Sequence, residues 1–129
     1  MTAPNMLLLY VSDVARSARF YAELLDCQPI DEAPNFAMLP LSGGVMLGLW
    51  ASHDVLPAAN AAGGSEIIFS VESPDAVAQR HADWTRRGLP IAQAPTAMDF
   101  GFTFVALDPD GHRLRVMSPT QTPTQTPTP

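Results

Sequence analysis

Residues 6–13 read MLLLYVSD, and residues 66–75 read EIIFSVESPD. Each is an apolar run that ends in residues suited to the start of a helix, Ser12-Asp13 in the first and Ser73-Pro74-Asp75 in the second. The side-chain oxygens of Ser and Asp accept hydrogen bonds from the free N–H groups at a helix N-terminus, and proline is favoured at the first helical position. Both stretches therefore predict a strand that leads directly into a helix.

The segments after the first stretch predict a helix and then a hairpin. Apolar residues recur at helical spacing over residues 14–25. The apolar runs 35–41 and 45–50 flank the turn Ser42-Gly43-Gly44, which predicts a hairpin with room for a shorter strand before it.

The segments after the second stretch repeat this order. The helix is expected to end at Gly88, because a glycine adopts the left-handed cap and Arg86-Arg87 suit the helix C-terminus. A short strand at residues 90–93 follows. The runs 100–107 and 113–117 then flank the turn 108–111, which reads DPDG.

The repeat predicts an α+β fold of two tandem βαβββ modules, at about residues 5–56 and 65–117. An Ala/Gly/Asn-rich linker, residues 57–64, joins them. We expect a single domain over residues 1–117, because 129 residues are enough for one core of ordinary size. Residues 118–129 read SPTQTPTQTPTP, and we expect them to form an extended or disordered tail that buries nothing.

The strand runs that begin at Met6, Val45 and Phe100 are apolar at both odd and even positions. A sheet with one face in water would alternate apolar and polar residues. Both faces are therefore expected to be covered or enclosed. We expect the modules to form a curved mixed sheet around a mostly apolar cavity, with the helices on the outer face.

Composition excludes several classes of protein. Thirteen acidic residues against seven basic ones give a net charge of −6, which disfavours nucleic acid and anionic membranes as partners. The only cysteine, Cys27, rules out an intramolecular disulfide and a thiolate metal cage. The first residues lack the basic segment of an export signal, and no apolar run approaches the roughly 20 residues of a membrane helix. We expect a cytoplasmic protein.

Several of these motifs together resemble one known superfamily. They are Val11-Ser12-Asp13, the helix residues Phe20-Tyr21 and Leu24-Leu25, and the late turn that ends in Gly111-His112. Over about residues 5–118 the sequence resembles the vicinal-oxygen-chelate superfamily, which includes glyoxalases, extradiol dioxygenases and bleomycin- or fosfomycin-resistance proteins. This resemblance implies the fold, and one such scaffold serves many chemistries.

The resemblance implies a metal site, but the residues at the implied positions do not suit one. Enzymes of the superfamily bind a divalent metal through one His or Glu from each of four strands. The matching positions here hold Met6, Gly48, Glu66 and Arg115. Arginine is a permanent cation without a free lone pair, and a thioether is a poor ligand for a hard metal. We therefore expect no metal and no other cofactor.

The same resemblance, combined with strand parity, predicts the residues that line the cavity. Methionines and a tryptophan suit a flat apolar ligand, because thioethers contact aromatic faces and the indole offers a stacking surface. The predicted ligand-binding residues are Met6, Leu8, Tyr10, Phe36, Met38, Met46, Gly48, Trp50, Glu66, Ile68, Phe102, Phe104, Arg115 and Met117.

Four of these positions have a second interpretation. Trp50 is a stacking surface for the ligand, or a core or dimer-interface residue. Gly48 makes room for a ligand ring, or only accommodates the backbone within a strand. Phe102 and Phe104 line the cavity or belong to the core, because the sequence does not fix which parity of their strand faces inward.

Glu66 and Arg115 stand at two of the implied metal positions, where the superfamily's side chains converge. We expect them to form an ion pair in place of the metal, because a facing guanidinium keeps a carboxylate ionised in an apolar setting. The alternative is that Arg115 extends into solvent and Glu66 caps a backbone donor.

The functional hypothesis follows from a cavity without catalytic residues. His53, His81 and His112 lack metal-site spacing, and no serine has the glycine-flanked context of a nucleophile. The sequence resembles most the phenazine-resistance, drug-sequestering type, and we expect a homodimer that binds a planar hydrophobic compound. The alternatives are a metal-dependent glyoxalase, dioxygenase or thiol transferase, and an accessory subunit with a filled cavity.

Overall fold

The computed structural model describes residues 3–120, and the chain forms two compact units that divide between Ala62 and Gly63. This division lies inside the expected linker, residues 57–64. Each unit has the predicted order of strand, helix and three strands. The α+β class and the tandem repeat are therefore confirmed, whereas a single domain that encloses a cavity stays a prediction.

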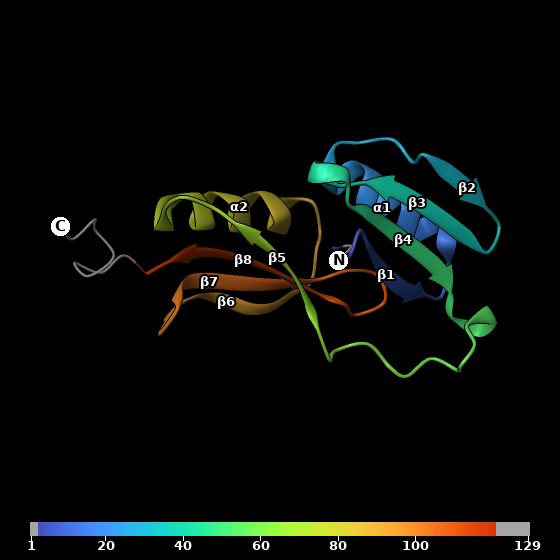
Figure 1. Ribbon diagram of the computed structural model, residues 1–129. Coiled ribbons are helices and arrows are strands. Elements are labelled where there is room, and N and C mark those ends of the chain that lie inside the picture. The colour runs from blue at the N-terminus through green and yellow to red at the C-terminus, as the bar shows by residue number, and fades with distance from the viewer. Residues whose placement is uncertain (1–2, 121–129) are drawn as a thin grey trace. The chain divides into compact units, whose positions relative to one another are not determined.

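The first unit is a four-stranded mixed sheet with one helix (Figure 1). The sheet has the order β1-β4-β3-β2, in which β1 and β4 are parallel and the other pairs are antiparallel. Its elements are β1 (Met6–Val11), α1 (Val14–Leu25), β2 (Asp31–Ala33), β3 (Phe36–Pro40) and β4 (Met46–Ala51), with short 3₁₀ turns at Ser42–Gly44 and Ser52–Asp54.

The second unit repeats this topology with the sheet order β5-β8-β7-β6. Its elements are β5 (Glu66–Ser70), α2 (Pro74–Arg86), β6 (Ile91–Met98), β7 (Gly101–Leu107) and β8 (Arg113–Pro119). Strand β6 is longer than the expected segment 90–93, and β8 continues two residues beyond Met117, the expected end of the folded part. The rest of the expected tail, residues 121–129, lies outside the described residues.

The predicted caps explain where both helices begin. The Asp13 side chain accepts a hydrogen bond from the Arg16 N–H at 3.1 Å, and the Ser73 hydroxyl accepts one from the Ala76 N–H at 3.1 Å. After α2, Gly88 takes a φ of +89°, a left-handed conformation that glycine adopts without strain. The first strand–helix corner of each unit is thus determined by local sequence.

The turn between β7 and β8 is held by one carboxylate. Asp108 is almost fully buried, and its Oδ1 accepts hydrogen bonds from the N–H groups of Asp110 at 2.9 Å and His112 at 2.8 Å. Gly111 completes the turn with a φ of +86°. This geometry fixes the register of β8 against β7.

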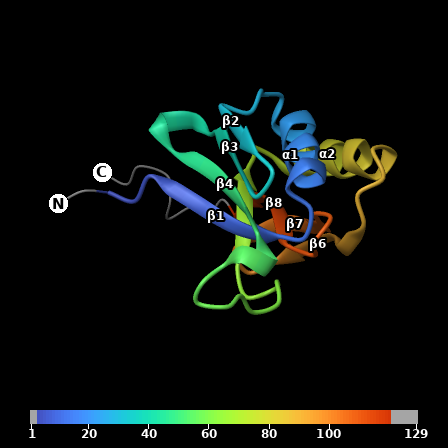
Figure 2. The same cartoon turned by 90° about the vertical axis from the view of Figure 1, so that its right-hand side faces the viewer.

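Each helix packs on one face of its own sheet, as Figures 1 and 2 show. In the first unit, α1 covers Leu39 on β3 and Leu47 and Leu49 on β4, all fully buried. In the second unit, α2 covers Phe104 on β7 and Val116 on β8. Within the described residues, the opposite face of each sheet carries no helix from its own unit.

Candidate functional site

The helix-free face of the first sheet is made almost entirely of apolar side chains, and we call it the apolar face. Three rows cross β1, β4 and β3 in register. The rows are Met6, Met46 and Pro40; Leu8, Gly48 and Met38; and Tyr10, Trp50 and Phe36. The structure thus places the eight ligand-binding residues predicted for the first unit together on one surface.

Several large side chains of the apolar face are exposed. Met6, Leu8 and Tyr10 are each exposed, although a soluble chain normally buries large apolar side chains. Trp50 is half-buried, and its ring lies edge-on to the Tyr10 ring at a centroid distance of 6.3 Å. A flat aromatic molecule could therefore reach indole, phenol and thioether groups at once.

The helix-free face of the second sheet is centred on an ion pair. The Arg115 guanidinium donates from Nε to Glu66 Oε1 at 2.8 Å and from Nη2 to Glu66 Oε2 at 2.9 Å. The predicted pair is therefore confirmed, and its geometry is bidentate, the strongest arrangement for these two groups. Arg113 contributes a second, longer contact of 3.9 Å to Glu66 Oε2.

Arg115 has three further neighbours that the sequence did not indicate. Its Nη1 donates to Gln93 Oε1 and to Thr103 Oγ1, both at 3.2 Å. The guanidinium carbon also lies 5.5 Å from the centroid of the Phe100 ring. The one available signal was Thr103 itself, a polar residue within the apolar run of β7.

The ion pair shifts the protonation of both partners. Hydrogen bonding from Arg115 lowers the pKa of Glu66, against a smaller opposing effect of burial. Hydrogen bonding to Glu66 raises the pKa of Arg115 in turn. Both shifts favour the charged forms, so the pair is a salt bridge at neutral pH.

The prediction that Phe104 lines the binding site is wrong. Phe104 is fully buried, and its ring packs edge-on against Trp84 of α2 at a centroid distance of 5.5 Å. Phe102 has the same parity on β7, so it too lies on the helix side of the sheet. The residues of β7 that share a face with Arg115 are Thr103 and Val105.

The other predicted residues of the second unit lie where parity placed them. Ile68 pairs with Arg115 across β5 and β8, and Met117 pairs with Thr103 across β8 and β7. Both are therefore on the helix-free face, and Ile68 is exposed. This face mixes charged, polar and apolar groups, unlike the apolar face of the first unit.

The donor set does not fit the metal that the fold family implies. In the first unit, the two implied positions supply the thioether of Met6 and no side chain at Gly48. In the second unit, both oxygens of Glu66 are engaged by Arg115, which is itself a cation. The described residues also contain no cluster of three or more His, Cys, Asp or Glu side chains that could hold an ion.

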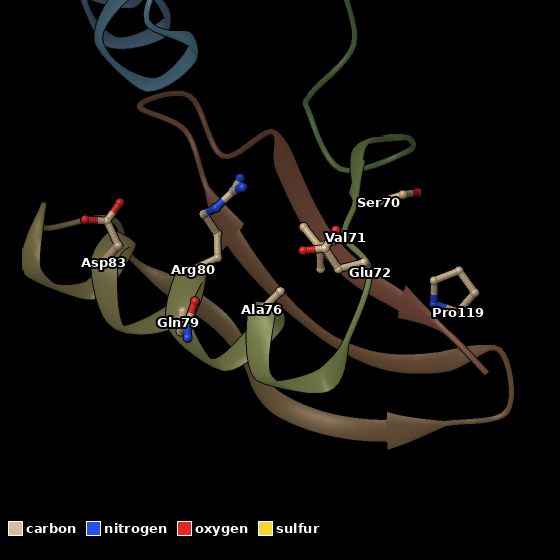
Figure 3. Close-up of a pocket in the computed structure, with 8 residues that line it drawn as sticks. All are labelled: Ser70, Val71, Glu72, Ala76, Gln79, Arg80, Asp83 and Pro119. Carbon is tan, nitrogen blue, oxygen red and sulfur yellow. The ribbon is translucent and has the colours of Figure 1, made fainter. Parts of the chain in front are cut away.

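A separate hollow of about 830 Å³ lies beside α2 (Figure 3). Ser70, Val71 and Glu72 line it from the end of β5, and Pro119 lines it from β8. On the helix side it is lined by Ala76, Gln79, Arg80 and Asp83. Asp83 is already paired with Arg86 and Arg87. No pattern in the sequence predicted this hollow, and none of its lining residues was a candidate for ligand binding.

Two further side chains that could be reactive, those of Cys27 and His81, are held in the packing of their units. Burial raises the pKa of the Cys27 thiol, and the neighbouring Asp26 carboxylate adds to this shift, so the reactive thiolate is disfavoured. His81 packs edge-on against Phe104 at 5.2 Å. Within residues 3–120 no helix is both long enough and apolar enough to cross a bilayer.

Comparison with known proteins identifies the family. A model of the glyoxalase/bleomycin resistance protein/dioxygenase superfamily matches residues 3–116, nearly the whole described chain. The chain belongs to this superfamily. Membership agrees with the paired βαβββ units and with the motifs at Asp13 and Asp108 that fix their corners.

This chain is 32% identical over 116 residues to one relative, the phenazine antibiotic resistance protein EhpR of Enterobacter agglomerans. The aligned region covers 88% of this chain and 89% of that protein. This chain is 41% identical to protein ATC0852 of Agrobacterium tumefaciens, whose solution structure it matches with a TM-score of 0.86 over 94% of this chain and all of that one. A glyoxalase-related enzyme from Fulvimarina pelagi shares the fold, with a TM-score of 0.77, 21% identity, and coverage of 92% of this chain and 88% of that chain.

Proposed function

We propose that this protein binds a planar, hydrophobic aromatic compound of the phenazine type and protects its host by holding that compound unchanged. The apolar face of the first unit, with Trp50 in it, is the observation that carries the proposal. The likeness to a phenazine antibiotic resistance protein supports a function of the resistance type.

The composition of the apolar face favours a flat ligand over a polar substrate. Across β1, β4 and β3, eight positions carry apolar or aromatic side chains and the ninth is Gly48, so these strands offer stacking and dispersion contacts. The charged residue on this face is Asp31, beside Met38 on the edge strand β2. Methionine side chains adapt to ligand shape, and the indole of Trp50 provides a rigid plate. Such a surface gains affinity by removing both itself and the ligand from water.

The chemistry of the second unit favours binding over metal-assisted catalysis. The Arg115 guanidinium holds both oxygens of Glu66, so this unit presents a closed salt bridge where the fold family implies metal ligands. A binding protein and an enzyme differ in what becomes of the compound. A sequestering protein returns the compound intact, whereas a glyoxalase, dioxygenase or thiol transferase returns an altered molecule.

We also propose a homodimer that acts in the cytoplasm. Leu7 on β1 and Ile68 on β5 are large exposed apolar residues on strands at the edge of their sheets. Unpaired strand edges with apolar side chains are favoured sites of association. The single cysteine fits a reducing compartment.

Fluorescence titration with phenazine tests the binding proposal. The chain has two tryptophans, and Trp84 is a core residue with 2% of its surface exposed. In a Trp84→Phe variant, Trp50 becomes the only indole, and phenazine should quench its emission saturably. Aromatic stacking of this kind contributes about 1–3 kcal/mol. Trp50→Ala should therefore weaken binding, measured by calorimetry, about 5- to 150-fold.

The control separates binding from folding and from chemistry. Thermal unfolding must show that each variant is folded at the titration temperature. Mass spectrometry of phenazine recovered after incubation should show an unchanged mass. Equal affinity in the wild type and in Trp50→Ala, or conversion of the compound by the purified protein, would contradict the proposal.

A further inference from the structure

Gly48 lies at the centre of the apolar face, although its backbone does not require glycine. It pairs with Leu8 of β1 on one side and with Met38 of β3 on the other. Six other glycines of the described chain have positive φ angles, but Gly48 does not. A glycine inside a regular strand weakens the sheet, since it has no side chain to pack. Its presence here therefore indicates that space above the backbone is needed.

That space is filled in this structure by the ends of three side chains. A Cβ atom on residue 48 would lie 2.8 Å from Leu8 Cδ1, 3.3 Å from Met6 Sδ and 3.3 Å from Phe36 Cζ. None of these three atoms is a backbone atom. They cover Gly48 so well that it is buried on a face without a helix.

The covering atoms belong to side chains that can turn aside. Methionine is unbranched and flexible. A change of the χ1 rotamer of a leucine or phenylalanine moves the end of its side chain away from its present position. Met6 and Leu8 are also exposed, so their alternative rotamers point into solvent without a clash with the core. A depression above Gly48 can thus form without any movement of the sheet.

The spacing of the side chains around Gly48 suits fused rings. Along β4, Met46 and Trp50 stand four residues apart, or about 13 Å at the rise of a strand. Across the sheet, Leu8 and Met38 are separated by two strand spacings, about 10 Å. Only the backbone of Gly48 forms the floor between these four side chains.

Resting on the proposed function, we propose that Gly48 is the residue that determines the ligand's size and shape. A planar fused-ring compound lies directly over the Gly48 backbone, in the place that a Cβ would occupy, after Met6, Leu8 and Phe36 have turned aside. Any larger residue at position 48 raises the floor and excludes the fused ring.

Phenazine binding to a Gly48→Ala variant tests this role. One added methyl group in a fitted apolar site changes affinity about 10- to 200-fold, so the dissociation constant of phenazine should rise by that factor. Gly64→Ala is the matched control, because Gly64 also lacks a positive φ and has no atom within 4 Å of its Cβ position. This control should bind phenazine like the wild type.

A double variant separates loss of ligand space from displacement of Leu8. If Gly48 only accommodates Leu8, then removing the Leu8 side chain relieves the 2.8 Å contact and restores binding. If the ring needs the Cβ space itself, Gly48→Ala with Leu8→Ala stays weak compared with Leu8→Ala alone. The double variant also lacks that close contact, so it provides a folded protein if Gly48→Ala alone does not fold.

The outcomes distinguish this inference from the proposed function. Absence of phenazine binding by the wild type overturns both. Wild-type binding that Gly48→Ala leaves unchanged, or that Leu8→Ala restores in the double variant, overturns the role of Gly48 and leaves the binding proposal standing.

Discussion

The ion pair between Glu66 and Arg115 should contribute measurably to the stability of the second unit. A double-mutant cycle with Glu66→Gln and Arg115→Met removes one partner, the other, and both. The two side chains are 24% and 14% exposed, so the pair is neither a surface salt bridge nor fully buried. Hydrogen bonds to charged groups contribute about 1.5–3 kcal/mol, and this pair has two of them, at 2.8 and 2.9 Å.

The single variants should differ in cost. Arg115→Met also removes the donor to Gln93 and Thr103, and it should lower the free energy of unfolding by about 3 kcal/mol. Glu66→Gln keeps one oxygen acceptor opposite Arg115, so its cost should be smaller, about 1–2 kcal/mol. The coupling energy between the two sites should be about 2 kcal/mol.

Urea unfolding of the four proteins, followed by circular dichroism, measures the coupling. The matched control is the pair formed by Asp83 of α2 and Arg87 directly after it, whose N···O distance is 3.1 Å but whose side chains are 36% and 48% exposed. An Asp83→Asn and Arg87→Met cycle should give a coupling below about 0.5 kcal/mol. A Glu66–Arg115 coupling no larger than this control would refute the reasoning.

Three further predictions concern acid stability, the core and metals. Because the folded-state pKa of Glu66 is lowered, its contribution to stability is present above about pH 4.3 and is lost as the pH falls below it. In an acid titration followed by circular dichroism, Glu66→Gln should lose less stability below that pH than the wild type. An equal loss in both proteins would contradict this. Phe104→Ala should lower the unfolding free energy by about 3–5 kcal/mol, yet calorimetry at a temperature where it is folded should show unchanged phenazine affinity, because Phe104 packs on the helix side. Elemental analysis of purified protein should find no stoichiometric metal, and Zn²⁺ or Mn²⁺ should not raise its melting temperature, since Arg115 occupies both oxygens of Glu66; one equivalent per chain would contradict this.

Local signals in the sequence were enough to predict the corners of the fold. Asp13 and Ser73 cap their helices through their own side chains, and the Asp108 turn closes on itself. Each of these hydrogen bonds joins residues two or three positions apart, so both partners can be recognised in one short stretch of sequence. The end of β8 was less predictable, because Pro119 pairs with Gly101 through a register that no local pattern encodes.

The sheet face of each candidate residue could be predicted where the strand parity was clear. Parity on β1 and β4 placed Leu8 and Trp50 on the same face, as the structure shows. On β7 every position but Thr103 is apolar or glycine, so parity alone could not separate Phe104 from Val105. The pairing with β8 decided the question, since Val116 and Phe104 are opposite each other on the helix side.

The ion pair was predicted from the family resemblance rather than from the pattern of residues. Glu66 and Arg115 are 49 positions apart, and no periodicity connects them. Gln93 pairs with Val105, which pairs with Arg115, and the register of β6 shifts on both sides of Gln93. Proline interrupts strand pairing, but the resulting displacement of neighbouring side chains depends on the whole sheet.

A crystal structure of the protein with bound phenazine would test the proposed binding face most directly. We predict density for one intact, flat ring system over β4, in contact with Met46 and Trp50 and stacked on the Trp50 indole. Density in the hollow beside α2, or a ring system that has been chemically altered or bound through a metal ion, would contradict the proposal.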